Sequence, residues 1–147
     1  MPTFGQWRYK VDREATINAY AKADSNHTSR CGCIYCRNFE RVRTIIFPQD
    51  FRTLIETLGI DYNKEAEAYH NARLATGLHD YGGWFHFVGT LDETGDFAPV
   101  DFGSGFTAWM LQAHAPRLSP LKGLSVVELG FHSDAVPWLL DEPEPDF

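Results

Sequence analysis

The hydrophobic pattern of the first sixty residues is helical over two adjacent stretches. Apolar side chains recur every three or four positions from residue 34 to residue 47, which predicts an amphipathic helix over 34–47. A second stripe of the same period predicts a helix over 48–58, with Pro48 in its first turn and Gly59 as its stop. Residues 13–23 are ambiguous, because their alanines favour a helix while their apolar positions also alternate with polar ones.

Beyond residue 61 apolar and polar positions alternate, as they do in strands with one buried face, and residues 7–11 show the same alternation. The expected later strands are 67–74, 83–91, 106–114 and 124–132, the first two forming a hairpin around a loop at 75–82, and 136–140 is a short last segment. Helices that come early and antiparallel strands that come late are typical of an α+β fold. We therefore expect an antiparallel sheet from the C-terminal two-thirds of the chain, packed with the two helices.

Both faces of the expected strand 83–91 are apolar, with Trp84 on one face and Phe85 on the other. Helices would cover one face, so a cavity or a second subunit is a candidate cover for the other. Trp84, His86 and Trp109 are candidates for the lining of an aromatic binding pocket, with ordinary core packing as the alternative.

The length and charge of the chain point to one domain with a charged tail. The 147 residues carry a formal net charge of −7, although the first sixty are net positive. We place a single globular domain at 1–140 and expect the acidic tail, 141–147, to be mobile because its two prolines prevent a helix. No apolar run approaches the roughly 20 residues that cross a bilayer, and the start of the chain does not resemble a signal peptide. A cytoplasmic protein is expected, and the acidic balance argues against general binding to nucleic acid or to membranes.

All three cysteines fall within six residues, Cys31-Gly32-Cys33-Ile34-Tyr35-Cys36. Thiols this close together do not form a scaffold of long-range disulfides. A cation would neutralise the repulsion between the thiolates, so the cluster predicts a metal site, with zinc as the candidate ion. A structural zinc site takes four ligands. His27 is the nearest candidate for the fourth position, and His86 is the alternative.

Two other interpretations of the cysteines stay open. Cys33 and Cys36 lie at the expected start of a helix, where the helix dipole lowers a thiol pKa and favours redox or nucleophilic chemistry. Buried cysteines also pack simply as small apolar residues. A pairing of Cys36 with His86 as nucleophile and base has no support from their spacing, and the sequence contains no nucleophile elbow or phosphate-binding loop. The catalytic residues are therefore unknown, and an enzyme is the less favoured class.

Arg37 and Arg41 lie four residues apart on the exposed side of the expected helix 34–47. Guanidinium groups suit phosphate or carboxylate partners, which makes these two arginines candidate binding residues. An ordinary solvated helix face is the alternative, and the absence of stacking aromatics on this face disfavours nucleic acid.

The order and spacing of several motifs resemble a group of small bacterial proteins of uncharacterised activity. The motifs are the CxCxxCxNF loop at 31–39, LGID at 58–61, YGGWFHFVG at 81–89 and VPWLL at 136–140. The resemblance covers about residues 31–140. It implies a bacterial, cytoplasmic origin and no particular chemistry.

Together these observations favour a small cytoplasmic binding or interaction domain of unknown specificity, with a zinc ion at the cysteine loop and a protein, or a second copy of the chain, as partner. The alternative is a metal- or thiol-dependent enzyme that acts on a small molecule in an aromatic pocket. Four protein ligands around a metal would favour the first, and three ligands plus water in a cleft would favour the second.

Overall fold

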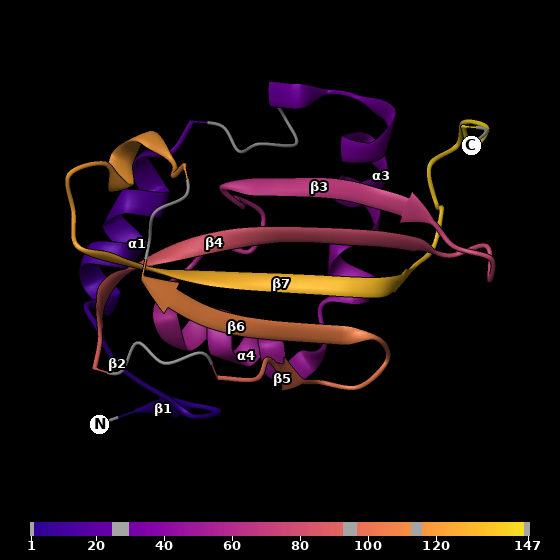
Figure 1. Ribbon diagram of the computed structural model, residues 1–147. Coiled ribbons are helices and arrows are strands. Elements are labelled where there is room, and N and C mark those ends of the chain that lie inside the picture. Colours follow the sequence, from indigo (N-terminus) through magenta and orange to yellow (C-terminus); the bar gives the residue numbers. More distant parts are fainter. Residues whose placement is uncertain (1, 25–29, 93–96, 113–115, 146–147) are drawn as a thin grey trace.

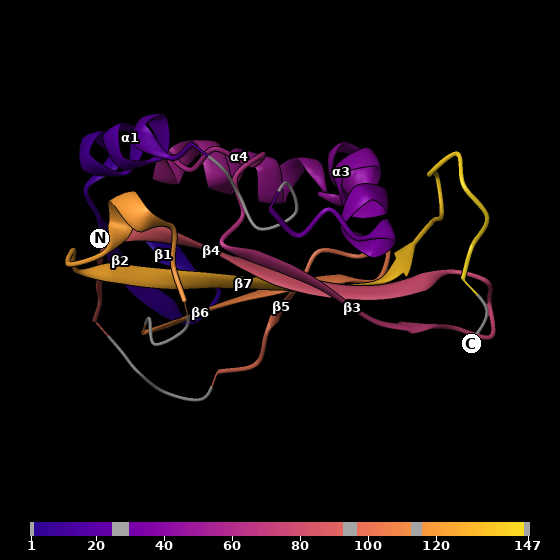
Figure 2. The same cartoon turned by 90° about the horizontal axis from the view of Figure 1, so that it is seen from above.

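A computed structural model describes residues 2–24, 30–92, 97–112 and 116–145, and within them helices cover one face of a seven-stranded antiparallel sheet (Figures 1 and 2). The helices are α1 (Arg13–Lys22), α3 (Ile34–Ile46) and α4 (Gln49–Leu58). The strands are β1 (Thr3–Phe4), β2 (Trp7–Val11), β3 (Glu67–Arg73), β4 (His79–Leu91), β5 (Val100–Asp101), β6 (Phe106–Gln112) and β7 (Val126–Val136). The α+β fold predicted from the sequence is confirmed.

The sheet has the order β1-β2-β4-β7-β6-β5, and β3 pairs with the first half of β4. Strand β4 is long enough to pair with β3 at one end and with β2 at the other, while β7 runs along its opposite side. We expected a sheet formed by the C-terminal two-thirds of the chain. The N-terminal strands β1 and β2 also belong to it. This strand order places β4 and β7 at the centre of the sheet.

The two predicted helices are confirmed, and the ambiguous N-terminal segment proves to be a third. The side chain of Asp12 caps α1 by accepting a hydrogen bond from the backbone N–H of Ala15 at 3.0 Å. Thr16 then attaches α1 to the sheet, because its hydroxyl accepts a hydrogen bond from the N–H of Val88 at 3.0 Å. Alternation of apolar residues in a segment rich in alanine was therefore not a sign of a strand.

The hairpin between β3 and β4 is tighter than the sequence predicts. The N–H of Leu74 donates to the carbonyl of Leu78 at 2.8 Å, so the turn spans 74–78 and His79 already belongs to β4. Strand β7 likewise starts later than predicted and continues to Val136, beyond which 137–140 is not a strand. Of the expected strand 106–114, the last two residues lie outside the described part of the chain.

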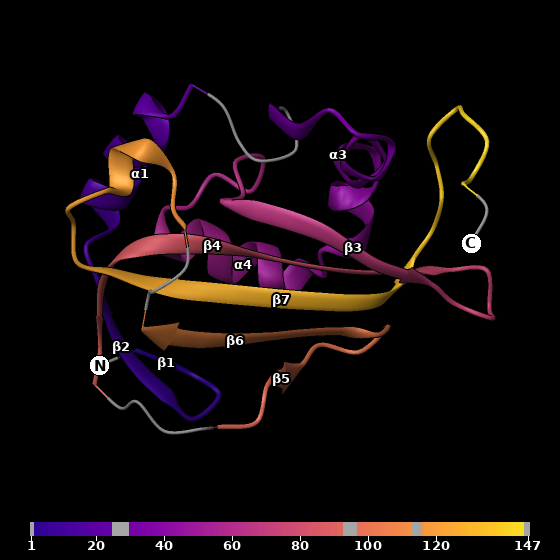
Figure 3. The same ribbon diagram turned by 45° about the horizontal axis from the view of Figure 1, so that its top comes forward.

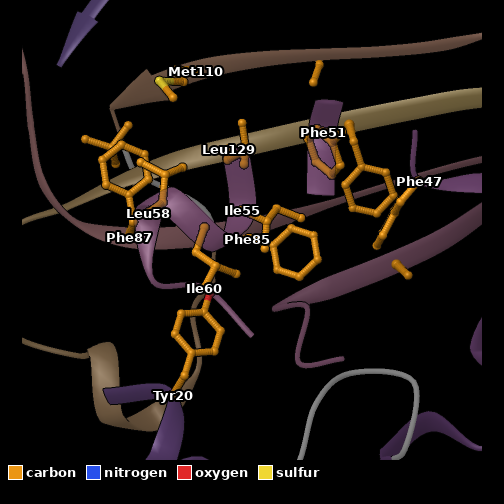
Figure 4. Close-up of a cluster of buried hydrophobic side chains, with 14 of the residues drawn as sticks. Tyr20, Phe47, Phe51, Ile55, Leu58, Ile60, Phe85, Phe87, Met110 and Leu129 are labelled. Carbon is orange, nitrogen blue, oxygen red and sulfur yellow. The ribbon is translucent and has the colours of Figure 1, made fainter. Parts of the chain in front are cut away.

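The core lies between the helices and the sheet, and phenylalanine rings together with aliphatic side chains fill it (Figure 4). Phe47, between α3 and α4, packs against Phe85 of β4 and Phe131 of β7, with ring centroids 6.0 and 5.2 Å apart. Phe51 of α4 packs against Phe106 of β6 at 4.8 Å. These contacts identify the face of the sheet that the helices cover. No helix in the described ranges is long and apolar enough to cross a membrane.

Candidate metal centre

The three cysteines lie at the start of α3, where the local backbone brings their side chains together. Gly32 has a φ of +65°, a left-handed conformation that turns the chain between Cys31 and Cys33. Cys33 is the N-cap of α3, and its Sγ accepts a hydrogen bond from the backbone N–H of Cys36 at 3.4 Å. A thiol thus occupies the capping position that serine or aspartate usually takes, and the next turn of the helix presents Cys36 beside it.

The sulfur atoms of Cys31, Cys33 and Cys36 all lie within 4.8 Å of one another, and none of the three forms a disulfide. Sulfur ligands bound to one zinc ion at about 2.3 Å in tetrahedral geometry lie about 3.8 Å apart. A contraction of about 1 Å or less would therefore bring the three sulfurs to ligand spacing. The prediction of a metal-compatible cysteine cluster is supported by this geometry.

The three thiols differ in exposure, and the pKa values of Cys33 and Cys36 are shifted in opposite directions. Cys36 is buried, and burial, assisted by the thiols of Cys31 and Cys33, raises the pKa of its thiol. Partial burial acts in the same direction on Cys33, but hydrogen bonds from the Cys36 N–H and from the two other thiols outweigh it and lower the pKa of Cys33. Cys33 is the thiol of this pair that ionises more readily.

A cavity of about 180 Å³ adjoins the thiols and is lined in part by Tyr35, His70 and Tyr81. Among the described residues, the cluster of ligand atoms within 4.8 Å of one another contains the three sulfurs alone, so His70 lines the same cavity without belonging to that cluster. The ring of His70 stacks on Tyr35 of α3, with centroids 4.1 Å apart. His70 of the sheet and the three thiols therefore border the same cavity.

The two histidines that the sequence offers as fourth ligand have different outcomes. His27 lies outside the described residues, so its role stays a prediction. His86 lies in β4 directly opposite Glu128 of β7, with its Nε2 3.4 Å from the Glu128 carboxylate. The structure thus pairs His86 with Glu128 and does not bring it into the cysteine cluster.

A chain of polar side chains leads from the cavity to the C-terminal segment. His70 Nε2 lies 2.8 Å from His79 Nδ1, and His79 Nε2 lies 2.9 Å from a carboxylate oxygen of Glu144. The ionised carboxylate of Glu144 can only accept hydrogen bonds, so a neutral His79 must donate to it from Nε2. His79 Nδ1 is then unprotonated and accepts a hydrogen bond from Nε2 of His70. Burial, together with the neighbouring His79, lowers the pKa of His70. The hydrogen bond from His79, assisted by Arg73, lowers the pKa of Glu144.

Sequence reasoning missed His70 and its pairing with His79. The register of the hairpin decides this pairing, and the predicted loop at 75–82 left His79 outside the strand. A tighter turn centred on Gly77 would have placed both histidines near the end of the hairpin. That turn was the only sequence signal available.

The two candidate arginines lie on the exposed side of α3, as predicted, but Arg37 has partners in its own chain. Its Nε donates to the carbonyl of Gly32 at 3.1 Å, and its guanidinium forms an ion pair with Glu142 of the acidic tail. Figure 3 shows the segment after β7 at the end of the sheet where the β3–β4 hairpin turns. Arg37 therefore connects the cysteine loop to the tail, while Arg41 is exposed.

Trp84, His86 and Trp109 share the face of the sheet opposite the helices. Trp84 and Trp109 flank Gly130 of β7 in register, one from β4 and the other from β6. The indole of Trp109 lies over Gly130, where a Cβ would come within 2.4 Å of the ring. The structure thus brings Trp84 and Trp109 together on this face of the sheet. His86, two residues along β4 from Trp84, lies on the same face but is buried together with Glu128.

Comparison of the chain with protein-family models, with curated proteins and with solved structures gives no match. The resemblance to small bacterial proteins accordingly stays a prediction, and the functional argument depends on the geometry of the site.

Proposed function

We propose that this protein is a small binding domain in which Cys31, Cys33 and Cys36 bind one zinc ion that fixes the start of α3. The observation that carries the proposal is the approach of the three sulfur atoms to within 4.8 Å of one another at a capped helix start. Two of the thiols are exposed, so the metal would have access from solvent. His27 is the protein ligand that we propose for the fourth position.

Cobalt substitution tests this ligand set. Cobalt bound by thiolates gives a charge-transfer absorption whose intensity follows the number of sulfur ligands. We expect this band at one equivalent of cobalt for the wild type, a weaker band for Cys31→Ser and Cys33→Ser, and a shifted visible spectrum for His27→Ala, because water would replace the imidazole in the fourth position. The matched control is His132→Ala, because His132 pairs with Asp80 in the sheet and should leave the spectrum unchanged. A wild-type chain without a cobalt–thiolate band would contradict the proposal.

The proposed partner is a protein or a second copy of this chain. Concentration-dependent light scattering separates these two: a mass that doubles with concentration assigns the second copy. A mass of one chain at all concentrations rules out the second copy and favours a different protein as the partner.

The cavity beside the thiols supports a second candidate, a metal-dependent enzyme that acts on a small molecule. A site with three protein ligands keeps one position for water or substrate, and the cavity with the chain of His70, His79 and Glu144 lies next to it. Addition of azide to the cobalt-substituted protein distinguishes the two candidates. A spectral shift with azide favours the open, enzymatic site, and an unchanged spectrum favours four protein ligands.

A further inference from the structure

A second candidate site lies on the opposite side of the helical layer from the cysteines, between α1 and α4. These helices lie side by side over the sheet (Figure 2). A cleft of about 610 Å³ opens between them and is also lined by residues 59–62. Its size falls within the roughly 300–1,000 Å³ of pockets that hold small molecules.

The floor of the cleft is apolar and built from buried side chains. Ile55 of α4 and Ile60 belong to the hydrophobic core and also line the cleft, and Tyr20 lies beside Ile60 (Figure 4). At the rim, Ile17 of α1 is 40% exposed, which leaves an apolar side chain in contact with water. A ligand with a hydrocarbon body would remove this surface from water.

The polar groups of the cleft include two arginines. Arg52 of α4 lines the cleft, and its Nε is buried without a hydrogen-bond acceptor in the described part of the chain. A buried N–H without an acceptor costs free energy, which an anionic oxygen would recover. Arg13 of α1 is held in place because its Nε donates to the carbonyl of Glu56 at 3.2 Å.

The charges of the lining decide between a monoanion and a dianion. Arg13 and Arg52 face two carboxylates of the same lining, Glu56 and Asp61, and Lys64 lies 4.0 Å from Asp61. The lining itself is neutral, and the adjacent Lys64 gives the cleft and its border a single excess positive charge, which suits one negative charge and disfavours two.

We propose that this cleft binds a small amphipathic carboxylate. Its carboxylate would pair with Arg52, and its apolar body would lie on Ile17, Ile55 and Ile60. This site is separate from the cysteine cluster and does not depend on the metal.

Octanoate is the probe for the test, and isothermal titration calorimetry with amide chemical-shift mapping are the measurements. We expect saturable binding with one site, and shifts concentrated in 17–21 and 52–62. Octanol should bind about tenfold more weakly, because it lacks the charge, and octyl phosphate should also bind more weakly. Binding of octanol as tight as that of octanoate, or tighter binding of octyl phosphate, would overturn the assignment.

Two variants with matched controls locate the site. Arg52→Gln should weaken octanoate binding about tenfold, while Arg41→Gln, on the exposed side of α3, should not change it. Ile17→Gln should weaken it roughly threefold, while Ile45→Gln, the same change at an exposed position of α3, should have no effect. All four side chains are at least partly exposed, so these variants should fold. Equal affinity of Arg52→Gln and wild type would refute the proposal.

Discussion

From its middle onward, helix α3 is held on the sheet by aromatic packing, whereas at its N-terminal end it is held by polar atoms and thiols. Phe39 and Val42 are fully buried, and Phe39 stacks on Phe131 of β7 with centroids 6.0 Å apart. At the other end Cys31 and Cys33 are exposed. From this difference we expect substitutions in the phenylalanine cluster to change the stability of the whole fold, and substitutions at the cysteine end to act locally, where we propose that a metal binds.

The largest expected effect is at the centre of the core. Phe131 contacts five other phenylalanine rings from α3, α4, β4, β6 and the α3–α4 junction. Phe131→Ala should lower the free energy of unfolding by about 3–5 kcal/mol, because it removes these contacts and leaves a cavity. Urea unfolding measures the loss, with the exposed Leu124→Ala as control. A loss below about 1 kcal/mol would show that the core does not dominate stability.

We expect the next largest effect at a buried ion pair in the last turn of α3. Arg43 Nη2 lies 2.9 Å from Glu65 Oε2, with side chains 6% and 0% exposed. Glu65→Gln should lower the free energy of unfolding by about 3 kcal/mol, because it leaves the buried Arg43 facing a neutral amide. The double variant Arg43→Met, Glu65→Leu should recover most of this loss, since it removes both charges. If the double variant is no more stable than Glu65→Gln, the loss does not arise from an uncompensated charge.

Asn38, near the N-terminal end of α3, attaches the C-terminal segment. Its Oδ1 accepts hydrogen bonds from the N–H groups of Leu139 and Leu140 at 2.9 and 3.1 Å. Asn38→Ala should lower the free energy of local opening of the C-terminal segment by about 2 kcal/mol, because it leaves these two donors without their acceptor. Amide exchange should accelerate at Leu139 and Leu140 far more than at Leu129 in the core. Equal acceleration at all three would mean that Asn38 contributes to global stability.

The smallest effect is expected in the acidic tail. The hydrogen bond from His79 and the charge of Arg73 hold the pKa of Glu144 below its usual 4.5. Its stabilising contribution is complete above pH 4.5 and is lost as the pH falls through the lowered value. Glu144→Gln should therefore reduce the melting temperature slightly at pH 6, by less than Asn38→Ala does. The two proteins should melt alike near pH 3, and a difference that grows with acid would contradict this interpretation.

The local patterns in the sequence predicted α3 and α4 well, because each buries one regular stripe and ends at a proline or a glycine. The cysteine cluster could be predicted equally well, since its members are close in sequence. The pairing of His70 with His79 could not be predicted, because it depends on the turn at 74–78 and on the strand register. Arg43 was also missed: a charged residue next to an apolar stripe gives no sign that Glu65, 22 positions away, will neutralise it.

Zinc content is the most direct test of the claim that the cysteine end of α3 is a metal centre. The wild-type protein is purified without a polyhistidine tag, dialysed against zinc at micromolar concentration and then against metal-free buffer, and its zinc is measured by mass spectrometry. We predict one zinc ion per chain for the wild type, with loss of most of it in Cys33→Ser and full retention in His132→Ala. Zinc well below one ion per chain in the wild type, or equal retention in Cys33→Ser, would contradict the account.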